Sequence, residues 1–344
     1  MALLLHPGAA AAPRPGLSGD DLIQLLVTVA GVLVVSGILL AANLGEKSYD
    51  WTGVSYALYL ALCGGVFALY SLAAAGYLIQ AAADPSRQAS ARAFLGAALG
   101  ALSGLLAAAA LLPPLRRALS RLLPGVRAAS PVHAVAGGLY VLVLLQQVAQ
   151  QVSFDQVQAF SQIKQGPSLL FIVGTNQLPM VVVSLAGVGF IVRRRAGDTL
   201  QRLGLYWPGL RWVVASIALA GGLLLFSHFF ELGMSRLVPG QTQALQKVQT
   251  QLLGNLHGVG QLAGLALAAG IGEEILFRGA LLPRFGNLSA AVLFAALHTQ
   301  YGFTFATVEI FVIGMMLGLL RPRAGTTGCI LAHAGYDLIA VLTP

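Results

Sequence analysis

Long apolar runs, separated by short polar, glycine-rich or proline-containing stretches, form the main pattern of this sequence. A helix needs about 20 mostly apolar residues to cross the hydrocarbon core of a bilayer. Six runs of about this length occupy the first two thirds of the chain, at residues 22–44, 54–82, 93–112, 132–149, 168–192 and 212–232. We interpret them as six membrane-spanning helices, with a kink at Pro179 in the fifth.

Shorter apolar pieces follow in the last quarter of the chain, at residues 256–282, 288–301, 303–320 and 326–342. A glutamine-rich stretch at residues 241–251 precedes them, and we interpret it as a loop or a surface helix. The predicted fold class is therefore all-α, a polytopic transmembrane helical bundle of about ten spans.

The same pattern divides the chain into four parts. Residues 1–20 are rich in alanine, proline and glycine and are expected to be disordered. Residues 21–232 form an N-terminal transmembrane module of about six spans, and residues 233–255 form a polar loop. Residues 256–344 form a C-terminal domain of about four spans.

The composition agrees with a membrane protein and excludes other classes. Hydrophobic residues make up 57% of the chain and charged residues 9%, whereas soluble domains carry about 25% charged residues. A soluble globular protein, a disordered chain and a nucleic-acid-binding module are excluded on this ground. We expect an integral protein of the plasma (inner) membrane of a bacterium, in contact with membrane lipids and not with nucleic acid.

The net charge of +8 is interpreted as a signal of topology. If the arginines at 193–195 face the cytoplasm and every span reverses direction, 14 of the 20 Lys and Arg residues lie on the inner side. This bias agrees with the positive-inside rule. It predicts that both termini lie outside.

Ionisable residues inside the apolar runs point to a functional site, because such groups are costly within a membrane. Most of them fall in the last quarter of the chain, which contains Glu273, Glu274, His298, Glu309, His333 and Asp337. Glu274 and Arg278 are four residues apart, so a helix brings them together as an ion pair. Glu273 points about 100° away from Glu274 and has no basic partner at helical spacing.

Helix geometry also predicts that four of these side chains meet. His333 and Asp337 lie four residues apart on one helix face. With a rise of about 1.5 Å per residue, Glu273, His298, His333 and Asp337 lie at depths of about 10 to 16 Å from the inner surface. This common depth predicts a water-filled chamber that opens to the cytoplasm.

These residue types suit hydrolysis. A carboxylate and a histidine can hold and deprotonate a water molecule, and a second histidine can donate to an oxyanion. Asp337 can orient His333 or, when protonated, donate as well. The same set could instead bind a divalent metal such as zinc through Glu273, His298 and His333. The residues alone leave the cofactor open between none and a divalent metal.

Four motifs carry a resemblance to a known family. EEILFR begins at Glu273, FAALH at Phe294, FVIGMMLG at Phe311 and HAGYD at His333. In this order on short apolar helices, they resemble the CPBP family of intramembrane proteases. That family includes the CAAX prenyl endopeptidases and bacterial relatives linked to bacteriocin processing and immunity.

The resemblance implies a glutamate-dependent peptidase on an all-helical fold. It implies that Glu273 is the catalytic base, that His298 holds the water, and that His333 and Asp337 stabilise the oxyanion. Glu274 and Arg278 would form a structural ion pair. The prenyl endopeptidases have asparagine at the position of Asp337, so prenyl specificity and metal dependence stay open.

The functional hypothesis is an intramembrane endopeptidase that acts on a peptide or protein substrate near the membrane. A non-catalytic binding or immunity protein on the same scaffold is the alternative. A transporter is disfavoured, because its polar residues would line a path through both leaflets, whereas these residues lie in the inner half.

Overall fold

The computed structural model describes residues 19–83, 90–163 and 166–342. Within these ranges every regular element is a helix, and no strand longer than an isolated bridge between Phe190 and Arg194 occurs. The all-α prediction is confirmed. The predicted disorder of residues 1–20 concerns a segment that, up to residue 18, lies outside the described residues.

The predicted spans of the N-terminal module correspond to long helices. They are α1 (Gly19–Gly45), α2 (Tyr49–Ala83), α3 (Ser90–Ala109), α5 (Pro131–Ser153) and α10 (Leu210–Leu237), together with the composite helix described next. The helix α3 packs between α2 and α5. The buried hydroxyl of Tyr59 on α2 donates to the carbonyl of Ala107 on α3 over 2.7 Å, which satisfies a polar group inside this apolar layer.

The fifth predicted span is composite. It consists of α7 (Leu169–Ile172), the π-helix η1 (Val173–Gln177) and α8 (Leu178–Val188). The predicted irregularity near Pro179 therefore takes the form of a widened π-helical turn directly before the proline. Such turns often occur at functional sites, and Gln177 at the end of this one faces the candidate site.

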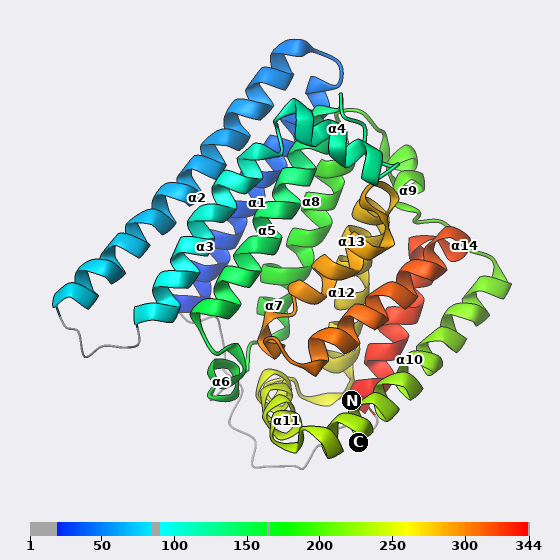
Figure 1. Cartoon of the computed structure of the whole chain (residues 1–344). Helices are drawn as coiled ribbons and strands as arrows, with labels where there is room; N and C mark the ends of the chain where they lie inside the picture. Colours follow the sequence, from blue (N-terminus) through cyan, green and yellow to red (C-terminus); the bar gives the residue numbers. More distant parts are fainter. Residues whose placement is uncertain (1–18, 84–89, 164–165, 343–344) are drawn as a thin grey trace.

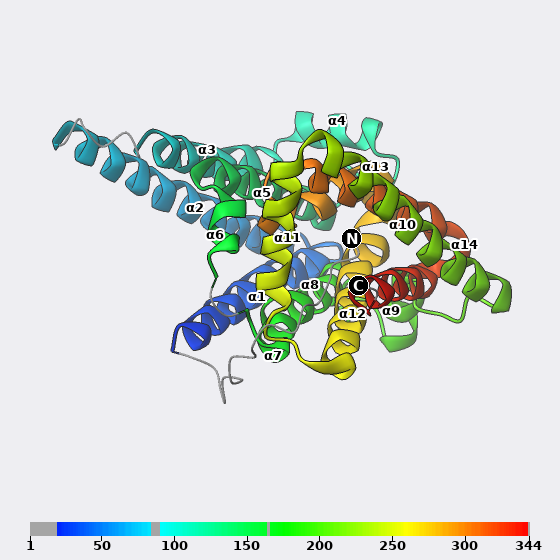
Figure 2. The same ribbon diagram turned by 90° about the horizontal axis from the view of Figure 1, so that it is seen from below.

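Short helices lie at the two ends of the bundle. They are α4 (Pro113–Leu122) and α9 (Ala196–Leu203) at one end, and α6 (Gln156–Ser161) and α11 (Pro239–Leu253) at the other. The glutamine-rich stretch predicted as a loop or surface helix forms α11, so the polar loop assigned to residues 233–255 is largely helical. Seen from below, α11 crosses the end of the bundle (Figure 2) and packs against α6 and α10.

The C-terminal part contains α12 (Gly258–Glu274), the π-helix η2 (Ile275–Leu281), α13 (Leu282–Ala296), a single 3-10 turn η3 (Thr299–Tyr301) and α14 (Phe305–Leu342). Glycines with left-handed φ values interrupt two of these helices, Gly286 (φ 80°) in α13 and Gly325 (φ 67°) in α14. Residues with a Cβ rarely adopt such angles. At Gly325 the chain turns back, so the two halves of α14 lie side by side (Figure 1) and the Cys329 thiol contacts the carbonyl of Leu317.

Seven helices in the described ranges are long and apolar enough to cross a membrane. The prediction of about ten spans is not confirmed by this criterion, and the C-terminal part is the reason. The helix α12 has 17 residues, and α13 beyond Gly286 ends at Ala296 after a rise of about 15 Å, half the thickness of a bilayer core. The helix α14 counts as one span although it reverses at Gly325.

The arginine-rich connections gather at one end of the bundle. The segment with α4 and the segment around α9 lie at the top of Figure 1, whereas α6, α11 and the end of α14 lie at the bottom. This arrangement is the one that the positive-inside rule requires if the top faces the cytoplasm.

The orientation can be tested with single cysteines. We expect Arg117→Cys on α4 and Arg195→Cys before α9, both exposed, to resist a membrane-impermeant thiol reagent in intact cells and to react after permeabilisation. Gln243→Cys on α11 is the matched control at the opposite end and should react in intact cells. Reaction of both arginine positions from outside would reverse the orientation.

Candidate active site

Glu274, the last residue of α12, lies at the centre of the candidate site. Its Oε1 atom accepts hydrogen bonds from Arg278 Nη1 at 2.5 Å and from His333 Nδ1 at 2.8 Å. The side chains of Glu274 and Arg278 are 0% and 1% exposed. The ion pair expected from the i,i+4 spacing is thus present, and it also holds a histidine from α14 that is 59 residues away in sequence.

Arg278, in the π-helix η2, connects three elements. Its Nη2 atom donates to the carbonyl of Gly314 on α14 at 2.8 Å, and its guanidinium lies 4.6 Å from the centre of the Phe294 ring on α13. A Cβ atom at position 314 would come within 3.2 Å of Phe294. The glycine of the FVIGMMLG motif therefore allows α14 to approach α13 and presents a carbonyl to the arginine.

Glu273 has different surroundings from its neighbour. Its Oε1 atom lies 3.4 Å from Gln177 Nε2, and its Oε2 atom is buried with no hydrogen-bond partner among the described residues. Within those ranges it forms no ion pair. One oxygen of this carboxylate is therefore free to receive a proton from a water molecule.

Gln177 is a contribution of the N-terminal module that the sequence analysis missed. A Cβ atom at Gly272 would come within 2.6 Å of Gln177 Oε1, so this glycine lets η1 and α12 meet closely. The amide pair Asn176–Gln177, directly before Leu178 and Pro179 in an apolar run, was the available signal. Polar groups within a membrane usually face the bundle interior.

His333 connects Glu274 to Asp337. Its Nδ1 atom bonds to the Glu274 carboxylate, and its Nε2 atom lies 3.5 Å from Asp337 Oδ2. A carboxylate can only accept, so Nδ1 carries a proton. The Nε2 atom can then accept from a protonated Asp337 or, when it is itself protonated, donate towards a substrate oxygen.

His298 lies beyond the end of α13 and not inside a span, so the predicted helical piece 288–301 is too long. The helix ends at Ala296, and Leu297 caps it. His298 Nδ1 lies 2.7 Å from the carbonyl of Phe294, which can only accept, so Nδ1 carries the proton and Nε2 offers a lone pair. The Phe294 ring contacts the rings of both His298 and His333, at centroid distances of 4.9 and 5.9 Å.

Two tyrosines also belong to this region. The Tyr301 ring stacks on the ring of His298 at a centroid distance of 6.4 Å. Glu309, for which the sequence offered no role, is buried and interacts with Ser227. The Tyr336 hydroxyl lies 3.0 Å from the hydroxyl of Ser227.

The metal alternative requires three ligands in one place. In the described part of the chain, no three His, Cys, Asp or Glu side chains are close enough together to hold a metal ion. The set Glu273, His298 and His333 is therefore not assembled as a ligand set, and His333 Nδ1 is already bonded to Glu274.

Elemental analysis tests this point. We expect protein purified without chelators to contain clearly less than one zinc per chain, because the donors are separated and partly engaged. The measurement is mass spectrometric metal analysis of wild type and His333→Ala. A stoichiometric metal that disappears in His333→Ala would contradict the expectation and restore the metal alternative.

Paired glutamates and two histidines inside an apolar helical bundle are the residues that the sequence analysis expects of a glutamate-dependent intramembrane protease. Residues 255–339 match the sequence model of the family described as type II CAAX prenyl endopeptidase Rce1-like. The resemblance drawn from the four motifs is confirmed, because residues 255–339 are similar to a family of CPBP-type intramembrane proteases. Residues 1–254 lie outside the match.

A curated relative is similar over part of its length. An uncharacterized 24.3 kDa protein of Escherichia coli is 26% identical over 147 residues, which are 40% of this chain and 64% of the relative. The chain thus spans less than two thirds of the length of the curated relative that it matches. No solved structure matches the chain.

Proposed function

We propose that this chain is an intramembrane endopeptidase that hydrolyses a peptide bond with a water molecule activated by Glu273 and His298. The observation that carries the proposal is the contrast between the two adjacent glutamates. Oε1 of Glu274 is held by Arg278 and His333, whereas Glu273 is buried and forms no ion pair with a described residue. In both side chains Oε2 has no hydrogen-bond partner among those residues, so the contrast lies in the ion pair. A buried carboxylate with a free oxygen is a suitable general base.

In the proposed reaction, the water oxygen attacks the scissile carbonyl carbon while its proton passes to Glu273. The lone pair of His298 Nε2 accepts the second hydrogen of the water and orients it. The carbonyl oxygen becomes an oxyanion and receives hydrogen bonds from His333 and from protonated Asp337. The carbon–nitrogen bond then breaks, and Glu273 returns the proton to the leaving amine.

Glu274 and Arg278 act through His333 in this proposal. A carboxylate that accepts from Nδ1 fixes the ring orientation and directs Nε2 towards Asp337. Similar carboxylate–histidine pairs orient catalytic histidines in other hydrolases. Glu274 is thus a positioning residue, and Glu273 is the base.

The proposed substrate is a peptide or protein at the membrane surface, reached through a chamber that opens to the cytoplasm. Asp337 donates only when it is protonated, whereas an asparagine at this position would donate at every pH. The proposed reaction therefore does not require a prenylated substrate, and peptides with and without a prenyl group should both be tested.

The test is a cleavage assay with purified protein. Wild type, Glu273→Gln and the exposed control Asp50→Asn are incubated in detergent and in liposomes with a peptide library whose cysteine-containing members are present with and without a farnesyl group. Mass spectrometry should detect the same new termini for wild type and Asp50→Asn and none for Glu273→Gln. A folded wild type that cleaves nothing in either setting would favour the binding or immunity protein.

A further inference from the structure

A cavity in the molecule lies apart from the candidate active site. It is a cavity of about 220 Å³ between α1, α5 and α8 of the N-terminal module and η2 and α13 of the protease domain. Its walls are almost entirely apolar and include Leu39, Val143, Val183, Leu276 and Leu293. None of the four proposed catalytic residues lines it.

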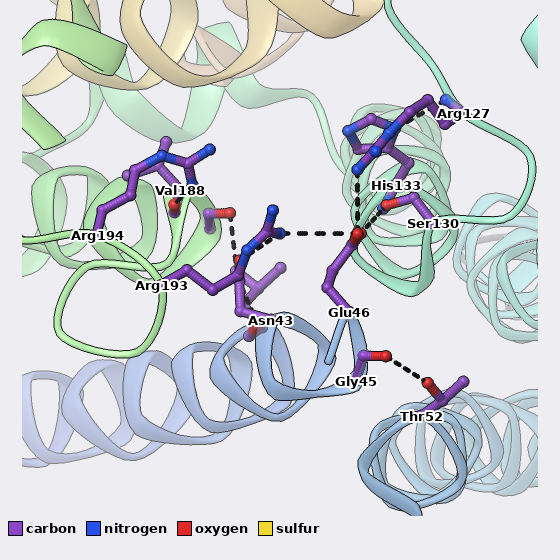
Figure 3. Close-up of polar contacts among 12 residues, drawn as sticks. Asn43, Gly45, Glu46, Thr52, Arg127, Ser130, His133, Val188, Arg193 and Arg194 are labelled. Carbon is purple, nitrogen blue, oxygen red and sulfur yellow. Dashed lines mark hydrogen bonds and ion pairs between the residues drawn. The ribbon is translucent and has the colours of Figure 1, made fainter. Parts of the chain in front are cut away.

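The mouth of this cavity is strongly basic. Five arginines from four separate segments line it, namely Arg127, Arg193, Arg194, Arg202 and Arg284. Figure 3 shows three of them, with Glu46 at the end of α1 pointing between Arg127 and Arg193. Glu46 lies 3.0 Å from Arg127 and 3.9 Å from Arg193, and it also bonds to the Ser130 hydroxyl.

Among the described residues, the other three arginines form no ion pair with an acidic side chain. Arg202 donates to the carbonyls of Gly279 and Ala280, and Arg194 donates to the carbonyl of Val188. Carbonyls satisfy hydrogen bonds but carry no net charge. Arg284 forms no hydrogen bond or ion pair with any residue in the described ranges, and Glu46 is the only acid in those ranges that forms an ion pair with the five arginines.

Crowding of these cations affects their protonation. Partial burial, followed by the repulsion of neighbouring arginines, lowers the pKa of Arg202 to about 10. The pKa of Arg284 is lowered for the same two reasons. Positive charge is therefore concentrated at the mouth beyond what the chain neutralises, and an anion at this position would stabilise it.

We propose that the cavity binds an anionic phospholipid, with its phosphate at Arg194, Arg202 and Arg284 and an acyl chain between the apolar walls. A free phosphate would leave the apolar space unfilled, and a dry apolar cavity of about 150 Å³ already takes up hydrocarbon ligands. Basic pockets between transmembrane helices bind anionic headgroups. The excess of arginine over glutamate disfavours a zwitterionic headgroup.

The proposed lipid site lies at the boundary between the N-terminal module and the C-terminal part of the molecule. The walls at Leu39 and Val183 belong to the N-terminal module, and those at Leu276 and Leu293 belong to the protease domain. An acyl chain between them would add apolar contacts across this boundary. The arginine end is also the end predicted to face the cytoplasmic leaflet, which carries anionic lipids.

Binding can be measured on the delipidated full-length protein. Dioctanoyl phosphatidylglycerol, dioctanoyl phosphatidylcholine and glycerol phosphate are titrated separately, with melting temperature and dissociation constant as readouts. Only phosphatidylglycerol is expected to raise the melting temperature by several degrees. Since each arginine near an anionic headgroup contributes about a factor of five in affinity, Arg194→Gln with Arg284→Gln should weaken binding roughly 30-fold.

Matched variants separate the site from general surface charge. Arg117→Gln removes an exposed arginine at the same end of the bundle, outside the cavity, and should leave binding unchanged. Ala136→Phe places a ring in the apolar part and should weaken binding without a change in charge. The melting temperature of each variant without lipid shows that it is folded.

Three results would overturn the proposal. Equal stabilisation by glycerol phosphate would identify a site for a free phosphate, and equal stabilisation by phosphatidylcholine would identify an apolar cavity without headgroup selection. Equal loss of affinity in Arg117→Gln and in the double variant would show that phosphatidylglycerol binds through the general surface charge at the arginine-rich end of the bundle and not in the cavity.

Discussion

Replacing Glu273 by glutamine is expected to reduce peptide cleavage by a factor of about 10² to 10⁴ while leaving the protein folded. An amide cannot accept the proton of the attacking water. The substitution keeps the hydrogen-bonding shape beside Gln177 and removes a buried carboxylate whose Oε2 has no partner among the described residues. Because burial of an unpaired charge is costly, the melting temperature should be unchanged or slightly higher.

The comparison needs the cleavage rate per folded molecule and the melting temperature of the same sample. Asp50→Asn, which neutralises an exposed acid at the start of α2, controls for the loss of one negative charge. If folded Glu273→Gln cleaves at nearly the wild-type rate, Glu273 is not the base, and the peptidase proposal loses its main support.

Glu274→Gln should have the opposite profile, with a large loss of stability as its primary effect. The substitution leaves Arg278, which is 1% exposed, without its anionic partner and replaces the carboxylate that accepts from His333 Nδ1 by a neutral amide oxygen, a weaker acceptor. Breaking a buried ion pair on one side costs about 3–5 kcal/mol. We expect a markedly lower melting temperature and lower yield. Cleavage in the folded fraction should also be slower, because a neutral amide oxygen holds His333 less firmly than a carboxylate.

A double variant distinguishes the lost pair from a mere packing defect. Glu274→Met combined with Arg278→Met removes both charges and keeps apolar side chains of similar length. It should be more stable than Glu274→Gln alone, because no buried cation is left unpaired. A Glu274→Gln protein that melts at the wild-type temperature would show that the pair does not support the fold.

Contacts within one helix could be predicted from the sequence, and contacts between helices could not. Glu274 and Arg278 are four residues apart, so helical geometry alone was sufficient to pair them. The bond from His333 to Glu274 depends on the reversal of α14 at Gly325, because the second half of that helix packs against α12, with Ala334 beside Gly270. Hydrophobic periodicity carries no information about which neighbours such a reversal creates.

The polar residues contributed by the N-terminal module were missed for a related reason. Gln177 reaches Glu273 because the π-helix η1 and Gly272 bring two helices close together. The basic residues around the cavity were interpreted only as a topology signal. Arg127, Arg202 and Arg284 are far apart in sequence, and only the packed bundle brings them to one opening.

The number of spans was the least predictable property. The apolar pieces predicted in the last quarter correspond to helical segments of the structure. Several of these segments are shorter than the thickness of a bilayer core. The chain breaks at Gly286 and Gly325 fall in the gaps between these pieces, at residues 283–287 and 321–325, so the breaks were predictable although the short spans were not. Length criteria that work for α1 or α5 therefore fail for the part of the chain that carries the site.

Because η2 (Ile275–Leu281) is a π-helix, the number of residues in it determines which way the residues after it face. A π-helical turn holds one residue more than an α-helical turn, so everything after it is rotated by about 100° relative to an uninterrupted α-helix. A relative with one residue deleted between Arg278 and Leu282 would keep an unbroken helix and all four motifs. Its Pro283 and Gly286 counterparts would nevertheless face another side of the bundle. An alignment gap inside this seven-residue segment therefore signals a different molecular geometry, even when every motif letter is matched.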